Sequence, residues 1–112
     1  MGDMFQTRPW PFERDRFPED LGAVVMKTVL NGDLPALQFV HTRDNSWLIA
    51  DGVSDPNASG ACIATHIRHV LNLDPGLEEL ATLPIGYVAN RSAAREPWVI
   101  TPFSYEDDQA SA

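Results

Sequence analysis

The stretch "ALQFVHTRDNSWLIADG", residues 36–52, decides the fold, because two apolar runs rich in strand-forming residues flank a turn dipeptide. The dipeptide is Asp44-Asn45, whose short polar side chains bond back to the backbone and tolerate turn geometry. We therefore expect an antiparallel hairpin. An odd number of loop residues puts His41 and Trp47 on one face of the sheet, an even number puts them on opposite faces, and the sequence leaves both registers open.

The same stretch raises the question of a chemical site, because it brings a histidine close in sequence to several aspartates. In the odd register His41 approaches Asp51 only diagonally, so a His–Asp dyad needs an added twist or bulge. We instead expect Trp47 and Ile49 in the core, with His41 as a partly buried polar residue. Asp44 and Asp51 are then turn residues.

Three other regions are typical of β-strands. Residues 23–30, "AVVMKTVL", are rich in β-branched side chains and precede Asn31-Gly32, a dipeptide suited to the positive φ angles of a tight turn. Residues 85–91, "IGYVANR", and residues 97–103, "PWVITPF", flank a short polar connection. These last two runs indicate a second hairpin.

The centre of the chain predicts two helices. In "ACIATHIRHVLNL", residues 61–73, apolar side chains recur at spacings typical of a helical stripe, and Ser59 is the expected cap. The second helix is short. Asp74 stands at its N-cap position, Pro75 at its first helical position, and Leu83-Pro84 ends it.

These elements follow the order βββααββ. Strands in two clusters around a helical segment indicate an α+β domain, in which an antiparallel sheet carries one longer and one short helix on one face. We expect a single domain over residues 23–104, an irregular arm rich in proline and aromatic residues over 1–22, and an acidic flexible tail over 105–112. The aromatic arm either packs across the domain or forms a homodimer contact.

Composition narrows the class of protein. A chain of 112 residues has room for one domain, its single cysteine excludes an internal disulfide, and we find neither a signal peptide nor an apolar run of membrane-spanning length. We therefore expect a cytoplasmic protein. The net charge of −8 disfavours nucleic acid and membranes as partners and favours a basic protein. The simpler alternative is that the acidity keeps the protein soluble.

Metal or nucleophile chemistry would rest on Cys62, His66 and His69, which a helix places on one side. That side is also the apolar one, free cysteine behaves as a small core residue, and ligands from a single helix cannot surround an ion. We expect core packing rather than a metal site or a Cys–His pair, and no cofactor. The acidic loop at 51–57 lacks the alternating acids and the closing glutamate of a calcium loop.

The stretch from Val25 to Trp98 resembles a family of small bacterial proteins that is catalogued as a domain of unknown function and grouped with the immunity proteins of polymorphic toxin systems. The resemblance lies in the order of motifs: a strand, a Gly turn before a Pro, a strand ending near His, an acidic turn into Trp, a D-P pair, then L-P-x-G, an aromatic residue and A-x-R. The residues that carry it are Asp44, Trp47, Asp74, Pro75, Leu83, Pro84, Gly86, Tyr87, Ala89, Arg91 and Trp98. It implies a protein that occludes a toxin's active surface without catalysis.

Charge and resemblance together predict a non-enzymatic, protein-binding role, with neutralisation of a basic toxin as its immunity-type form. The expected partner-binding residues are four acids near the helices and two residues that serve either packing or contact: Asp51, Asp55, Glu78, Glu79, Tyr87 and Arg91. The alternative is a small-ligand-binding or enzymatic domain with a pocket between sheet and helix. In that case His41, His66 or Arg91 supplies the polar groups.

Overall fold

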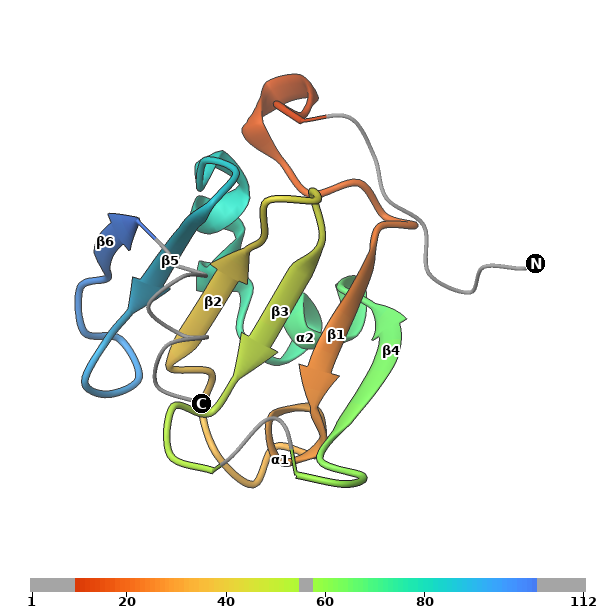
Figure 1. Ribbon diagram of the computed structural model, residues 1–112, viewed down its shortest axis with the longest axis vertical. Helices are drawn as coiled ribbons and strands as arrows, with labels where there is room; N and C mark the ends of the chain where they lie inside the picture. Colours follow the sequence, from red (N-terminus) through yellow and green to blue (C-terminus); the bar gives the residue numbers. More distant parts are fainter. Residues whose placement is uncertain (1–9, 55–57, 103–112) are drawn as a thin grey trace.

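Six strands form one sheet in the computed structural model, which describes residues 10–54 and 58–102 (Figure 1). Across the sheet the strands follow the order β4-β1-β3-β2-β5-β6. Their bounds are β1 Gly22–Met26, β2 Gln38–His41, β3 Trp47–Ala50, β4 Cys62–His66, β5 Tyr87–Asn90 and β6 Val99–Pro102. The helical segments are η1 Glu13–Asp15, α1 Lys27–Leu30, α2 Arg68–Leu73 and η2 Pro75–Thr82. The α+β class is confirmed.

The predicted hairpin at residues 36–52 is present and has the odd register. β2 and β3 pair antiparallel, with His41 opposite Trp47 and Phe39 opposite Ile49. Asn45 has a φ of 65°, a conformation that asparagine tolerates better than most residues. All four paired side chains therefore face the same side of the sheet.

The sheet is mixed, so the prediction of a purely antiparallel sheet is wrong. β1 runs parallel to β3, with Val24 opposite Leu48, and antiparallel to β4. The expected strand at 23–30 stops at Met26, because the next residues turn into α1 and bury Val29. The chain then passes the end of β3 before it enters β2, so β3 rather than β2 lies beside β1 (Figure 1).

The predicted helix over residues 61–73 is also wrong in its first half. Residues 62–66 form β4, an edge strand paired along its whole length with β1, and α2 begins only at Arg68. Pairing with β1 prevails over the helical spacing because the segment contains β-branched side chains that suit a pleated surface. Ser59 therefore caps no helix, and Ile63 is 43% exposed.

The short second helix and the second hairpin are confirmed. Asp74 occupies the N-cap position of η2, although its carboxylate makes no cap bond, and the segment ends before Leu83 as expected. β5 and β6 then pair antiparallel, with Ala89 opposite Ile100.

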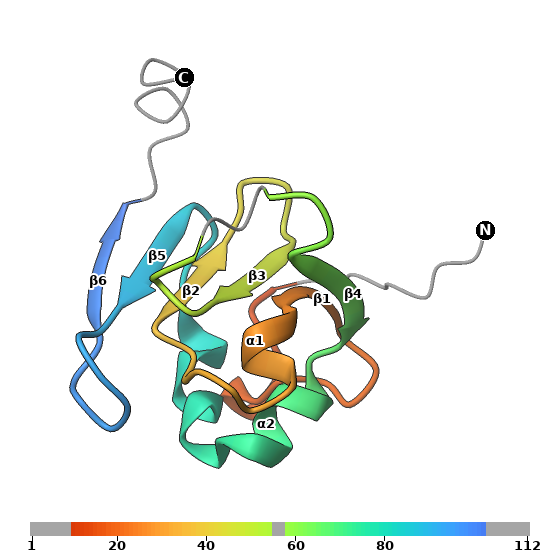
Figure 2. The same cartoon turned by 90° about the horizontal axis from the view of Figure 1, so that it is seen from below.

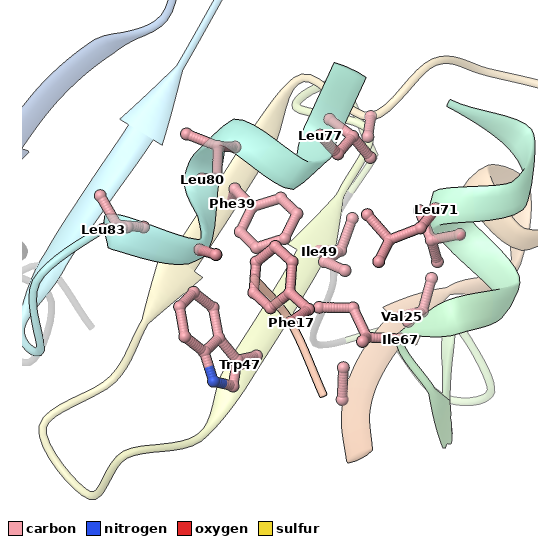
Figure 3. Close-up of a cluster of buried hydrophobic side chains, with 14 of the residues drawn as sticks. Phe17, Val25, Phe39, Trp47, Ile49, Ile67, Leu71, Leu77, Leu80 and Leu83 are labelled. Atoms are coloured by element: carbon pink, nitrogen blue, oxygen red, sulfur yellow. The ribbon is translucent and has the colours of Figure 1, made fainter. Parts of the chain in front are cut away.

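The helical segments lie on one face of the sheet, and the core fills the space between them (Figure 2). Phe39 and Trp47 from the sheet meet Leu77 and Leu80 from η2 there, and Phe17 of the arm packs among them (Figure 3). The aromatic rings contact one another in tilted and edge-to-face geometries, which aromatic pairs prefer.

The described part of the arm packs across its own domain. Phe12 and Phe17 are 7% and 3% exposed, and the indole Nε1 of Trp10 donates a hydrogen bond to the Ala81 carbonyl at 3.0 Å. Side chains of the arm therefore belong to the same core as the sheet and the helical segments. The tail over 105–112 lies outside the described residues, as does Asp55. Within the described ranges no helix is long and apolar enough to cross a membrane.

Candidate functional site

A cleft of about 560 Å³ opens between the helical layer and the loop that follows α1. Its walls come from three parts of the chain: α1 with the loop at 32–36, α2 with the start of η2, and the connection between β5 and β6. Gly32 has a φ of 81° and lets the chain reverse after α1, and residues 32–36 then line the cleft. The fold thus brings together segments that are far apart in sequence.

The cleft is lined mainly by apolar side chains. Val29, Val70 and Leu77 are almost fully buried, whereas Leu73 is 55% exposed. Contact of an exposed leucine and an apolar hollow with water is unfavourable, and covering them with another apolar group lowers the free energy. The cleft therefore favours an apolar group from another molecule.

Three charged residues also line the cleft: Asp33, Asp74 and Arg95. Asp33 and Arg95 are exposed, and Asp74 is half-buried because its carboxylate pairs with Arg91. The lining itself is therefore close to neutral. The attraction for charged molecules comes from the chain as a whole, with its net charge of −8.

Arg91 fixes the geometry of the walls. Its Nη2 donates to Asp74 Oδ2 at 3.0 Å, its Nε donates to the Ala36 carbonyl at 3.0 Å, and its guanidinium lies 4.3 Å from the centre of the Trp98 ring. Packing and contact are the two roles expected for Arg91. Its side chain is only 5% exposed, and its bonds are those of a packed residue that joins two segments of the cleft walls.

Asp51 is the clearest case of a predicted surface acid with a structural role. Its buried carboxylate accepts hydrogen bonds from the Thr28 hydroxyl at 2.7 Å and from the backbone N–H groups of Val53 and Ser54 at 2.8 and 2.7 Å. Burial disfavours the charged form, but these bonds outweigh it and lower the pKa of Asp51 to about 2. The turn role expected for this residue is confirmed.

The other predicted partner-binding residues do not gather around Asp51. Glu78 accepts the Phe17 N–H at 2.6 Å, and Phe17 packs on Trp47 at the start of β3, whereas Asp51 follows the end of that strand. Glu79 is exposed on η2, and Tyr87 is half-buried against the core. The acids of the described residues therefore form no single cluster around the loops.

His41 is enclosed rather than partly buried. Its Nδ1 lies 2.7 Å from the Leu83 carbonyl, its Nε2 lies 2.7 Å from Asn45 Oδ1, and the Trp10 ring contacts it edge-on. With no exposed surface, it cannot reach a substrate. The dyad with Asp51 does not form, because the carboxylate bonds elsewhere.

The expected stripe of Cys62, His66 and His69 does not exist, because the first two residues lie on β4 and the third on α2. Both histidines are exposed, so the prediction that they pack in the core is wrong. Cys62 is half-buried, and burial together with the charge of Asp51 raises its pKa. Among the described residues, no group of three His, Cys, Asp or Glu side chains is placed to hold a metal ion.

A second hollow, of about 390 Å³, lies between the arm and the start of α2. Arg14, Arg16 and Arg68 line it, with Glu19 as the acid among its lining residues. Three of the chain's eight basic residues thus meet at one place. The acidity of the protein is therefore unevenly distributed.

No family model, curated protein or solved structure matches this chain. The description of the site thus depends on its geometry. Sequence reasoning did not single out Leu73, Asp33 or Arg95 as site residues. The available signal was Leu73, a large apolar residue at the end of a short helix, immediately before a capping aspartate.

Proposed function

We propose that this chain is a non-catalytic protein-binding protein that seats an apolar side chain of a basic partner in the cleft beside Leu73. The observation that carries the proposal is the cleft itself, with an apolar lining and a leucine that is 55% exposed. Covering one such side chain typically contributes about 1.5 to 3 kcal/mol. Anchors of this kind often dominate the energy of an interface.

The charge of the chain supports a basic partner. A net charge of −8 attracts a basic protein over distances longer than any contact and raises the association rate at low salt. Asp33 and Arg95 then add short-range selection, because they are exposed on different walls of the cleft. The partner segment that fits best has an apolar residue next to charged ones.

The resemblance to immunity proteins agrees with this mode of action. Such a protein works by occlusion, so it needs a complementary surface rather than catalytic groups. In this chain that surface is the cleft and its rim, with Glu79 as an additional exposed acid on η2. A basic toxin would be neutralised when the cleft covers its active surface.

The proposal is tested with the purified chain as bait in extracts of its native cells, at low and at moderate salt. Leu73→Ser removes the exposed anchor, and Val53→Ser makes a comparable change at a site that is 76% exposed and outside the cleft. We expect one basic protein that is retained by the wild type and by Val53→Ser, and lost with Leu73→Ser or with salt. Retention by all three proteins, or recovery of none, contradicts the proposal.

The size of the cleft favours a second candidate function, because small-molecule sites commonly enclose about 300 to 1,000 Å³. In that case a small apolar compound, rather than a protein side chain, occupies the space next to Val70 and Leu77. Such a compound raises the Tm by an amount that grows with the logarithm of the ratio of its concentration to its Kd. A thermal-shift screen with the wild type and Leu73→Ser separates the two candidates.

A further inference from the structure

β6 forms one edge of the sheet (Figure 1). Among the described residues it pairs only with β5, and all of its side chains are exposed, with Val99 at 63% and Ile100 at 49%. An edge strand with free backbone groups and β-branched apolar side chains is a template for another strand. Many native edges carry charges that prevent this, and β6 has none.

The hydrogen-bond pattern shows which backbone groups of β6 point outward. The Arg91 N–H donates to the Leu37 carbonyl at 3.1 Å, two residues that continue the antiparallel register of β5 and β2. Backbone groups alternate in direction along a strand, so Ala89 also bonds toward β2 and Asn90 bonds toward β6. Asn90 lies opposite Val99.

The same alternation continues along β6. Val99 and Thr101 direct their N–H and C=O groups to β5, and Ile100 therefore directs both of its groups away from the sheet. Pro102 also faces outward but has no N–H to donate. The free edge is thus centred on Ile100.

We propose that β6 pairs antiparallel with β6 of a second copy of this chain, around a two-fold axis at Ile100. Each Ile100 donates its N–H to the carbonyl of the other copy, and the two side chains lie directly opposite each other. Because Ile100 lies on both sides of the axis, its outward N–H and C=O groups find matching groups on the second copy. The self-complementary centre is the reason to assign this edge to a second copy.

The β6 edge is better suited to pairing with a second copy than the described part of the aromatic arm. Phe12 and Phe17 are buried in their own core, so they are not available to a second copy.

A short strand pair buries less than the roughly 1,200 Å² of a standard stable interface. We therefore expect a reversible dimer whose population depends on concentration.

Sedimentation velocity of the full chain, from about 1 to about 500 µM, tests the proposal over the range of weak interfaces. Ile100→Pro removes the outward N–H but no bond to β5, and Ile100→Lys keeps the N–H but places like charges opposite each other. Val53→Lys is the control, an exposed apolar residue outside β6. Circular dichroism confirms that each variant is folded.

We expect a monomer–dimer equilibrium for the wild type and for Val53→Lys, and a Kd at least roughly tenfold higher for both Ile100 variants. A wild type that stays monomeric throughout overturns the proposal. So does a dimer that is unchanged in both folded Ile100 variants. Because the cleft variant Leu73→Ser leaves β6 intact, the dimer and the partner-binding function are tested separately.

Discussion

The imidazole of His41 lies flat on the indole of Trp47, with ring centroids 3.7 Å apart and an interplanar angle of 13°. The two residues are opposite each other in the β2–β3 hairpin, and both point into the core. A histidine in this position is held by stacking on one side and by its two nitrogen contacts at the ring edge. It links the hairpin to the end of η2 through the Leu83 carbonyl.

His41→Phe keeps a ring on Trp47 but removes both nitrogen contacts. Because it leaves the Leu83 carbonyl without this partner in a buried place, we expect a loss of about 1 to 3 kcal/mol in the free energy of unfolding. Urea unfolding at pH 7 measures it. His66→Phe, at an exposed histidine, is the control and is expected to change stability by less than about 0.5 kcal/mol. Equal stability of the two variants would show that the contacts of His41 contribute nothing.

Asp51 makes the free energy of unfolding depend on pH in the acidic range. Its pKa is lowered from 3.8 to about 2 in the folded state, so the ionised carboxylate stabilises the fold by about 2 kcal/mol above pH 4. Because the folded pKa is the lower one, this contribution is lost as the pH falls from about 4 to about 2. Asp51→Asn is expected to lose about 2 kcal/mol at pH 7. Urea titrations at pH 7, 5 and 3 should show this difference shrinking at the lowest pH, and a constant difference contradicts the assignment.

Cys62 is expected to react slowly with iodoacetamide, because burial and the nearby charge of Asp51 raise its pKa. Removing that charge in Asp51→Asn should shift the pH profile of alkylation to lower pH. Thr28→Val is the matched control, since it removes a bond to the carboxylate but keeps the charge. A profile that is identical in all three proteins and in glutathione rules out the raised pKa.

Arg91→Lys is expected to lower the free energy of unfolding by about 2 kcal/mol, more than the roughly 1 kcal/mol expected for Asp74→Asn. A lysine ammonium group cannot donate to both the Ala36 carbonyl and the Asp74 carboxylate while it also stacks on the Trp98 ring. The ion pair with Asp74 contributes less, since that carboxylate is 39% exposed. Urea unfolding of both single variants and the double variant measures the coupling. A larger loss for Asp74→Asn would mean that the ion pair, not the guanidinium plane, holds the walls.

Phe17→Ala is expected to lower the free energy of unfolding by about 3 to 5 kcal/mol, as much as Phe39→Ala, although Phe17 belongs to the arm. The ring is 3% exposed and contacts Phe12, Phe39 and Trp47. Arg16→Ala, an exposed neighbour, is the control for changes in the arm that leave the core intact. Thermal unfolding distinguishes them, and a small effect at Phe17 would mean that the arm only rests on a core that is complete without it.

The sequence predicts the elements whose signals are local. The turn at Asp44-Asn45 predicts the β2–β3 hairpin, and Pro75 with its neighbours predicts η2. Residues 62–66 do not follow this rule, because they fit a helical spacing and a strand equally well. Only the presence of β1, about forty positions away in the chain, decides between them.

The candidate site is predicted less well for the same reason. Arg91 was singled out by the resemblance, but its acceptors, Ala36 and Asp74, belong to segments that meet only in the folded chain. Asp51 is predicted both as a turn residue and as a partner-binding acid, because nothing local shows that Thr28 bonds to its carboxylate. Leu73 fits the predicted helical stripe, but it is the last residue of α2 and is 55% exposed.

The position of β1 between β4 and β3 has a consequence for how the protein folds. Both neighbours of β1 lie later in the chain, so the strand has no partner until residues 47–66 have been made and have reached it. The two hairpins close over short loops, whereas β1 and β4 close over a long one, which is slower. We therefore expect β1 to join the sheet last. Until it does so, its apolar residues are open to chaperones and to aggregation.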